Sequence, residues 1–295
     1  MTQDTKEVET ENNLHPEIAK IHEKYGQSNL VDMVHQFLSE KDQAHQQMRA
    51  DQGKMGKFFP SSVGACKRMI GYQMKGYPGK PKDGRTSLIL ENGNSFHERM
   101  EDMFDEMGIL IAPELKLKDE SLKISGRSDA IIWNFLKTSG EPVEGDEIIT
   151  LESPTYDDEG LETGTEVVYK GLASDVLIVE LKSSKASGYE KYTPKTKPQK
   201  KHEMQLQLYF YLTGIPQGLV YYENKNDQSQ KYYYVERDDK MIEKIVSDIE
   251  FNVEHFNAGT LPEREFQPTS FECMYCSFSE ICYPDMNPYD VNDII

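Results

Sequence analysis

An apolar run that ends in charged residues constrains the fold more than any other feature of the chain. Residues 175–182 read Asp-Val-Leu-Ile-Val-Glu-Leu-Lys, so four consecutive apolar residues lead directly into Glu180. A short run rich in β-branched residues is typical of a strand buried on both faces. Alternate residues of a strand point the same way, so Glu180 and Lys182 share one face and Leu181 points to the other. A strand-end salt bridge would account for Glu180 and Lys182, but a buried strand that delivers both at its end favours a functional site.

Hydrophobic periodicity predicts an α/β domain for most of the chain. Helices are expected over residues 15–47, 88–107, 202–212 and 239–256. Strands are expected over residues 111–118, 122–126, 128–134, 175–182, 217–223 and 230–236. This order favours a mixed central sheet flanked by helices. We expect residues 1–52 to form an N-terminal helical appendage and residues 53–295 to form the main domain, with an acidic insertion over about 137–170 that forms a hairpin or a long loop.

The charge is segregated along the sequence. The chain carries 51 acidic and 33 basic residues, a net charge of −18, which taken alone disfavours binding to nucleic acid. Residues 141–166 contain ten acidic residues and no basic residue. Residues 182–201 contain seven lysines and a single acidic residue, and residues 54–82 are also basic. A local basic surface can therefore exist on an acidic protein.

A second acidic residue completes a candidate metal site. Asp129 lies in the strand expected over residues 128–134, and Glu180 lies near the end of the buried strand. Carboxylate oxygens are the ligands that Mg²⁺ and Mn²⁺ prefer, and the backbone carbonyl of Leu181 could add a further ligand. A divalent cation offsets the charge of a phosphodiester and lowers the pKa of a bound water. Lys182 would then hold the attacking water or stabilise charge on the phosphate.

Five short motifs occur in an order that resembles the RecB/AddB-like PD-(D/E)XK nucleases. They are Gly-x-x-x-His ending at His97, Gly-x-x-Asp ending at Asp129, Glu-x-Lys at Glu180 and Lys182, Gln-x-x-x-Tyr at Gln205 and Tyr209, and Cys66 followed by basic residues. Each motif is degenerate, so the ordered set carries the resemblance, which spans about residues 58–284. The set is similar to the iron–sulfur branch of these nucleases, which includes the CRISPR-associated spacer-acquisition exonucleases.

The resemblance implies a restriction-endonuclease-like PD-(D/E)XK core and a metal-dependent deoxyribonuclease. It implies that His97 is a metal ligand together with Asp129, Glu180 and the Leu181 carbonyl. It also implies catalytic roles for Asp129, Glu180, Lys182, Gln205 and Tyr209, of which Gln205 and Tyr209 would shape the active-site cleft. The family suggests exonuclease action on DNA ends or single strands, in recombination, repair or DNA degradation, and a phage source. Taken singly, His97 could be an exposed helical residue and Tyr209 a core residue.

The four cysteines of the chain fall at one early and three late positions. Cys273, Cys276 and Cys282 have the spacing Cys-x2-Cys-x5-Cys, and Cys66 lies far upstream. This spacing suits a tetrahedral metal or a cluster, and it does not separate zinc from iron. The resemblance implies a [4Fe–4S] cluster on these four residues, which would join the two ends of the catalytic domain. Zinc is the alternative.

Lysines that follow the buried strand are candidates for DNA contacts. Residues 185–201 contain glycine and proline and are expected to form a mobile loop beside the catalytic strand, although a solvated charged loop would have the same composition. Lysines can track phosphates and tyrosines can stack on bases. The candidates are Lys185, Tyr189, Lys191, Tyr192, Lys195, Lys197, Lys200 and Lys201, with Phe58, Phe59, Lys67 and Arg68 as weaker ones.

The sequence also bears on location and partners. No apolar run approaches the ~20 residues that a membrane-spanning helix needs, and the polar, acidic residues 1–13 do not resemble a secretory signal. We therefore expect a cytoplasmic protein without a membrane partner. A protein partner could bind the N-terminal helices or the acidic insertion. Two other functions remain open: a non-catalytic or partner-dependent DNA-binding subunit of a nuclease or recombination complex, and a zinc-stapled protein in which Glu180 and Lys182 form only a salt bridge.

Overall fold

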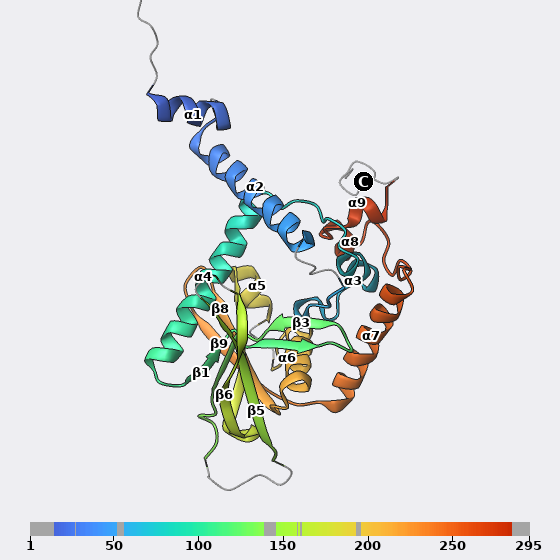
Figure 1. The fold of residues 1–295 in the computed structure, drawn as a ribbon. Helices are drawn as coiled ribbons and strands as arrows, with labels where there is room; N and C mark the ends of the chain where they lie inside the picture. Colours follow the sequence, from blue (N-terminus) through green and yellow to red (C-terminus); the bar gives the residue numbers. More distant parts are fainter. Residues whose placement is uncertain are drawn as a thin grey trace, which may run out of the picture.

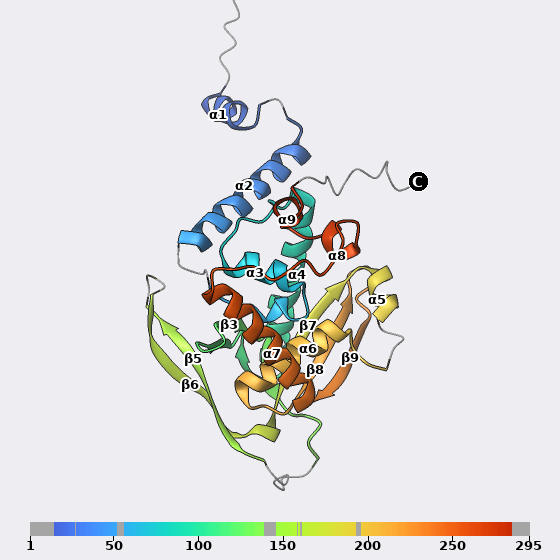
Figure 2. The ribbon, with the colours of Figure 1, turned by 90° about the vertical axis from the view of Figure 1, so that its right-hand side faces the viewer.

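The computed structural model describes residues 15–26, 28–51, 56–138, 146–157, 159, 161–192 and 196–284 (Figures 1 and 2). The α-helices are α1 (Pro16–Tyr25), α2 (Leu30–Asp51), α3 (Lys67–Met74), α4 (Gly84–Glu106), α5 (Ala186–Tyr192), α6 (Lys200–Thr213), α7 (Asp239–Asn257), α8 (Phe271–Met274) and α9 (Ser279–Cys282). The strands are β1 (Leu110–Pro113), β2 (Lys116–Asp119), β3 (Ile124–Arg127), β4 (Ala130–Trp133), β5 (Ile148–Tyr156), β6 (Glu162–Leu172), β7 (Val176–Ser184), β8 (Gln217–Asn224) and β9 (Gln230–Glu236). Two short 3₁₀ helices are η1 (Pro60–Ser62) and η2 (Ala173–Asp175).

Five of the strands form one mixed sheet in the order β1-β4-β7-β8-β9. The strands β7 and β8 pair in parallel, and the other neighbours pair antiparallel. The apolar run predicted from the sequence is the central strand β7, whose residues 176–181 are all buried. The expected α/β fold with a mixed sheet flanked by helices is therefore confirmed.

The two faces of β7 pack against different helices, as Figure 1 shows for α4 on one side and α6 on the other. Val176 and Ile178 join a core with Phe210 and neighbouring residues of α6. Leu177, Val179 and Leu181 alternate with them and join a second core with residues of α4, namely Phe96, Met100 and Phe104. Burial on both faces explains why the sequence of β7 is continuously apolar rather than alternating.

The strand β4 is too short to cover all of β7. Its pairing with β7 runs from Trp133 opposite Val176 to Ala130 opposite Val179, whereas β7 continues to Ser184. On the other side, β8 accompanies β7 as far as Ser184. Residues 181–184 of β7 therefore have one open edge, on the side where β4 begins.

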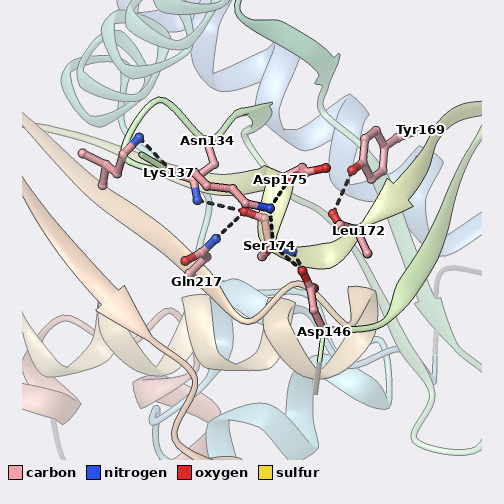
Figure 3. A network of polar contacts seen from close by, with 9 residues as sticks. Asn134, Lys137, Asp146, Tyr169, Leu172, Ser174, Asp175 and Gln217 are labelled. Carbon is pink, nitrogen blue, oxygen red and sulfur yellow. Dashed lines mark hydrogen bonds and ion pairs between the residues drawn. The ribbon is translucent and has the colours of Figure 1, made fainter. Parts of the chain in front are cut away.

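The acidic insertion is a hairpin of β5 and β6, as one of the two sequence interpretations expected. Figure 3 shows the polar network that fixes its base to the main sheet. Ser174 lies at the centre: its N–H and hydroxyl bond Asp146, and its carbonyl accepts from Asn134 and Gln217, both at 2.9 Å. Lys137 donates to Ser174 Oγ at 2.9 Å and also bonds Asp175. The other end of the hairpin lies beside β2, where Glu162 forms ion pairs with Lys116 and Lys118.

Two N-terminal helices replace the single helix expected over residues 15–47. The first helix ends at Gly26, whose φ of 63° lies in the region that glycine adopts without strain. The second helix, α2, packs against α4, and Asp42 forms an ion pair with Lys82 at 2.6 Å. None of the described helices is both long and apolar enough to cross a membrane. The division into a 1–52 appendage and a 53–295 domain stays a prediction.

Two further predictions of secondary structure were wrong. The strand expected over residues 111–118 is broken into β1 and β2, because the backbone turns at Glu114 with a φ of 40° and its N–H donates to the Asp129 carbonyl. The loop expected over residues 185–201 contains the helix α5 and the beginning of α6. The side chain of Asn226 accepts a hydrogen bond from the Ala186 N–H and so caps the start of α5.

Candidate active site

Asp129 and the open edge of β7 come together at one end of the sheet. Asp129 lies between β3 and β4, and its Oδ2 accepts a 2.6 Å hydrogen bond from the main-chain N–H of Leu181. In an antiparallel arrangement, the N–H and C=O of one strand residue point toward the same neighbour. The Leu181 carbonyl therefore faces the same open edge as Asp129. This is the position in which the sequence interpretation expected a backbone ligand.

Glu180 is a fully buried carboxylate with half of its hydrogen-bonding capacity unused. Lys182 Nζ contacts Glu180 Oε1, whereas Glu180 Oε2 is buried and has no hydrogen-bond partner among the described residues. Burial and then the charge of Asp129 raise the pKa of Glu180 to about 8, against the opposing effect of Lys182. Such an orphaned carboxylate oxygen is costly unless a ligand takes it up.

Lys182 is held by the same acidic pair. Burial opposes its charge, but the neighbouring carboxylates of Glu180 and Asp129 raise the pKa of Lys182 above the usual value. The ammonium group is therefore positively charged and lies at the carboxylates, with 26% of its side chain exposed. The structure thus brings together Asp129, Glu180, Leu181 and Lys182, as predicted.

The helix α4 adds His97 to this group and also an acidic residue that the sequence interpretation missed. His97 Nδ1 lies 3.5 Å from Asp129 Oδ1. Glu101 lies one turn further along α4, and burial, followed by the charges of Glu114 and Asp129, raises its pKa to about 7. The four-residue spacing of His97 and Glu101 on a predicted helix would have placed both on one face.

Gln205 and Tyr209 form a buried chain of hydrogen bonds on α6. Gln205 Nε2 donates to the Tyr209 hydroxyl at 2.8 Å, and the hydroxyl donates to the carbonyl of Arg127 at 2.8 Å. Burial, with the charges of Glu180 and Asp129 as further causes, raises the pKa of Tyr209 well above the usual value. Both residues therefore lie close to the acidic site, and Tyr209 also belongs to the main core.

The predicted DNA-binding lysines lie on α5 and around the start of α6. Lys185, Lys191, Lys197, Lys200 and Lys201 are exposed. Burial of its charged group and the charge of Lys182 lower the pKa of Lys201, so this lysine lies near the acidic site.

The other residues predicted to contact DNA differ in where they lie and in how far they are buried. Tyr189 is half-buried against the main core, and Tyr192 ends α5. Lys195 lies outside the described residues. Phe58 is a core residue, Phe59 is partly buried, and Lys67 is paired with Asp248 at 2.8 Å.

The four cysteines lie next to α3 and in the C-terminal segment that contains α8 and α9. Cys66 precedes α3, Cys273 lies in α8, and Cys282 ends α9. Burial, followed by the charges of Cys273 and Cys282, raises the pKa of Cys276. The pKa of the Tyr283 hydroxyl is raised by partial burial and by the charges of Cys273, Cys282 and Cys66. All four are free thiols.

Arg68 lies against the cysteines with one unused donor. Its guanidinium donates to the Pro262 carbonyl at 2.6 Å and lies over the Tyr72 ring. Burial opposes the charge of Arg68, but Tyr72 and Cys282 raise its pKa above the usual value. Arg68 Nε is buried and has no partner among the described residues.

Neither predicted metal site is assembled in full. Within the part of the chain that the structure describes, no three His, Cys, Asp or Glu side chains are grouped so that they could hold a metal ion. The ligand roles of His97, Asp129 and Glu180 and of the four cysteines therefore stay predictions.

The chain resembles a known protein family over part of its length. Residues 169–283, less than half of the chain, match the model of the PD-(D/E)XK nuclease superfamily. This segment includes Glu180, Lys182, Gln205 and Tyr209 but neither His97 nor Asp129. No curated protein sequence matches the chain.

Two solved structures are distantly similar. The crystal structure of SSO0001 has a TM-score of 0.47 and 19% identity, covering 89% of this chain and 100% of that one. The alkaline exonuclease LHK-Exo from Laribacter hongkongensis has a TM-score of 0.40 and 13% identity, covering 70% of this chain and 90% of that one. The superfamily match, which covers the central strand that carries Glu180 and Lys182, supports a PD-(D/E)XK nuclease superfamily domain in this part of the chain.

Proposed function

We propose that this protein is a metal-dependent deoxyribonuclease, most closely allied to the RecB/AddB-like iron–sulfur branch, that acts as an exonuclease on DNA ends or single strands. It would act in recombination, repair or DNA degradation. One observation carries the proposal: Glu180 Oε2 is buried without a partner, next to Asp129 and Lys182. A purely structural salt bridge would leave no such oxygen, because burying an unpaired carboxylate oxygen is unfavourable.

The residues at the open edge of β7 fit a hard divalent cation. Asp129, Glu180 and the Leu181 carbonyl offer oxygen donors, which Mg²⁺ and Mn²⁺ prefer, and His97 offers a nitrogen donor that Mn²⁺ tolerates. When bound, the ion would offset phosphate charge and lower the pKa of a water. The hydrogen bond from Leu181 N–H orients the Asp129 carboxylate and leaves Oδ1 on the side of His97.

The remaining residues of the site would act on the substrate. Lys182 carries a positive charge beside both carboxylates, so it can bind a non-bridging phosphate oxygen or orient the attacking water. Gln205 donates to the Tyr209 hydroxyl, which donates to the Arg127 carbonyl, and these two bonds fix this wall of the site. The exposed lysines of α5 and α6 lie beyond Lys182 and would track the DNA backbone.

We also propose that the four cysteines hold a [4Fe–4S] cluster, with zinc as the alternative. The observation that supports a bound group is the buried Nε of Arg68, which lacks a partner beside Cys282. A donor of this kind can bond a thiolate or a sulfide, and such hydrogen bonds are a usual feature of iron–sulfur sites. The cluster would tie α3 to α8 and α9 and so join the two ends of the domain.

Cleavage of end-labelled single- and double-stranded DNA tests the nuclease. The assay compares wild type with Glu180→Gln and Lys182→Met, in Mg²⁺, in Mn²⁺ and in EDTA. Glu106→Gln, an exposed position on α4, is the matched control. We expect metal-dependent loss of label in wild type and the control, and a loss of at least about 100-fold in both site variants. A folded, metal-loaded wild type that cleaves neither substrate would instead favour a non-catalytic or partner-dependent DNA-binding subunit.

Absorption of an anaerobic preparation tests the cluster separately. Thiolate-to-iron charge transfer should give a broad shoulder near ~400 nm. A colourless protein that carries stoichiometric zinc would replace the cluster with a zinc site and leave the nuclease proposal intact.

A further inference from the structure

His202 and Tyr222 form a hydrogen-bonded pair beside the active site. His202 Nδ1 lies 2.8 Å from the Tyr222 hydroxyl, and the main-chain N–H of Gln199 donates to the same hydroxyl at 3.0 Å. Tyr222 is 1% exposed, whereas the His202 ring is only partly buried. The pair therefore has one end fixed in the core and one end near the surface.

The hydrogen bond to Tyr222 couples the hydroxyl proton to the tautomer of His202. The Tyr222 oxygen accepts from Gln199 N–H, and its distance from His202 Nδ1 allows the hydroxyl to donate to that nitrogen. With Nδ1 as the acceptor, a neutral imidazole carries its proton on Nε2. Burial, together with the charges of Lys182 and Lys201, lowers the pKa of His202 to about 3, which keeps the ring neutral. Among the described residues, no hydrogen-bond acceptor of Nε2–H is found.

The sheet register places this pair next to Lys182. Tyr222 on β8 is the direct neighbour of Lys182 on β7, and neighbouring residues of paired strands project to the same face. Tyr222 also shares the core on the α6 face of the sheet, and His202 lies on α6 above it. The unused donor of His202 therefore belongs to the wall that carries Lys182 and Lys201.

A phosphate is the ligand that this wall fits. Lys182 and Lys201 supply positive charge near His202. A neutral N–H donor near these two lysines adds a directed hydrogen bond without adding a third charge that would repel them. Lys182 already lies against Glu180, whereas Lys201 has no ion pair among the described residues, so a phosphate oxygen would supply the counter-charge of Lys201.

We propose that His202 is a substrate-positioning residue whose Nε2–H donates a hydrogen bond to a phosphate oxygen of the DNA strand, beside the phosphate held by Lys182. The inference rests on the proposed nuclease function, because it assigns the ligand of the same site. Tyr222 acts through His202 by fixing its tautomer. The alternative is a histidine that only packs, in which case the identity of the protonated nitrogen would not affect DNA binding.

Two substitutions of His202 test the roles of its two ring nitrogens separately. Gln places an amide donor near the position of Nε2, whereas Asn reproduces only the position of Nδ1. Affinity for a short, fluorescent oligothymidylate would be measured in the Glu180→Gln background with Mg²⁺, so that no cleavage interferes. We expect H202N to weaken binding roughly ten- to a hundredfold, the range of a hydrogen bond to a charged group, and H202Q to retain most of the affinity. Equal loss in both variants, or none in H202N, would overturn the proposal.

Nitrogen NMR of the His202 ring tests the proposal without altering His202. In the Glu180→Gln protein, the proton should be found on Nε2, and the Nε2 resonance should shift when the oligothymidylate is added. A proton on Nδ1, or an Nε2 resonance that does not move at saturation, would overturn the proposal even if both variants misfold. Because DNA affinity and NMR do not require turnover, a wild type that fails to cleave would contradict the proposed nuclease and leave this test intact.

Discussion

The main-chain N–H of Leu181 donates a 2.6 Å hydrogen bond to Asp129 Oδ2 and so joins the two parts of the chain that carry the acidic residues of the site. This contact lies just before β4 begins, where β7 continues without β4 as its neighbour. It gives Asp129 a structural role in addition to its proposed role as metal ligand. The two roles can be separated, because an amide side chain keeps the acceptor and loses the charge.

We predict that Asp129→Asn and Asp129→Ala both lose cleavage but differ in stability. The Asn side chain can still accept from Leu181 N–H, whereas Ala leaves that N–H without its partner, at about 1–3 kcal/mol. Urea unfolding of the metal-free proteins would measure the difference. If Asp129→Ala were as stable as Asp129→Asn, the hydrogen bond from Leu181 N–H to Asp129 would not stabilise the folded protein.

The buried carboxylate of Glu180 should make the metal-free protein less stable as the pH rises. Its pKa in the folded protein is about 8, above the ordinary value of 4.5. Between these values the folded state holds a proton that the unfolded chain has released, so stability falls with rising pH. Glu180→Gln removes this group, so its thermal unfolding midpoint should exceed that of wild type in EDTA at pH 8 and approach it near pH 5. A wild-type advantage at pH 8 would contradict the burial of an ionisable Glu180.

Tyr209→Phe should affect stability more than chemistry. The hydroxyl accepts from Gln205 and donates to the Arg127 carbonyl, and Gln205 is 7% exposed. Its removal leaves buried polar groups unpaired, which costs about 1–3 kcal/mol. Cleavage by the folded variant should stay within about tenfold of wild type, since one neutral hydrogen bond is worth about 1 kcal/mol. Tyr211→Phe, on the exposed side of α6, is the control, and a loss of 100-fold or more in Tyr209→Phe would assign the hydroxyl a catalytic role.

Lys200 should contribute to DNA binding through charge alone. It is exposed in the first turn of α6, close to Lys201. A single phosphate contact contributes about 0.7 to the slope of log K against log salt on single strands. Lys200→Ala should lower the slope by about that amount for every DNA sequence, and Lys244→Ala, exposed on α7, should not. An unchanged slope in Lys200→Ala would remove this lysine from the DNA-binding surface.

The sequence predicted the parts of the site that depend on local pattern. The apolar run of β7 identifies a buried strand in any context, so the common face of Glu180 and Lys182 follows from alternation alone. Asp129 follows from a motif that precedes a short strand. The superfamily match over residues 169–283 includes Glu180 and Lys182 but not Asp129.

The parts that the sequence did not predict depend on contacts between distant residues. The break at Glu114 is held by a hydrogen bond to the Asp129 carbonyl, and α5 begins at a cap from Asn226, forty positions along the chain. Neither the Asp129 carbonyl nor the Asn226 side chain could be recognised as a hydrogen-bond partner from the sequence around it. Glu101 is different, because its spacing from His97 on one helix face was available in the sequence.

Arg68 provides the sharpest test of the cysteine site. Its Nε is buried without a partner among the described residues, while Cys282 raises the pKa of its guanidinium. If a cluster takes up this donor, Arg68→Met should lose both charge and hydrogen bond, and Arg68→Lys should keep only the charge. Iron content and absorbance near ~400 nm, measured anaerobically, should therefore fall in the order wild type, Arg68→Lys, Arg68→Met. Arg85→Met, an exposed position on α4, controls for the loss of an arginine. If Arg68→Met retained wild-type iron and absorbance while remaining folded, Arg68 would have no role at the cluster, and its buried Nε would have to be satisfied in another way.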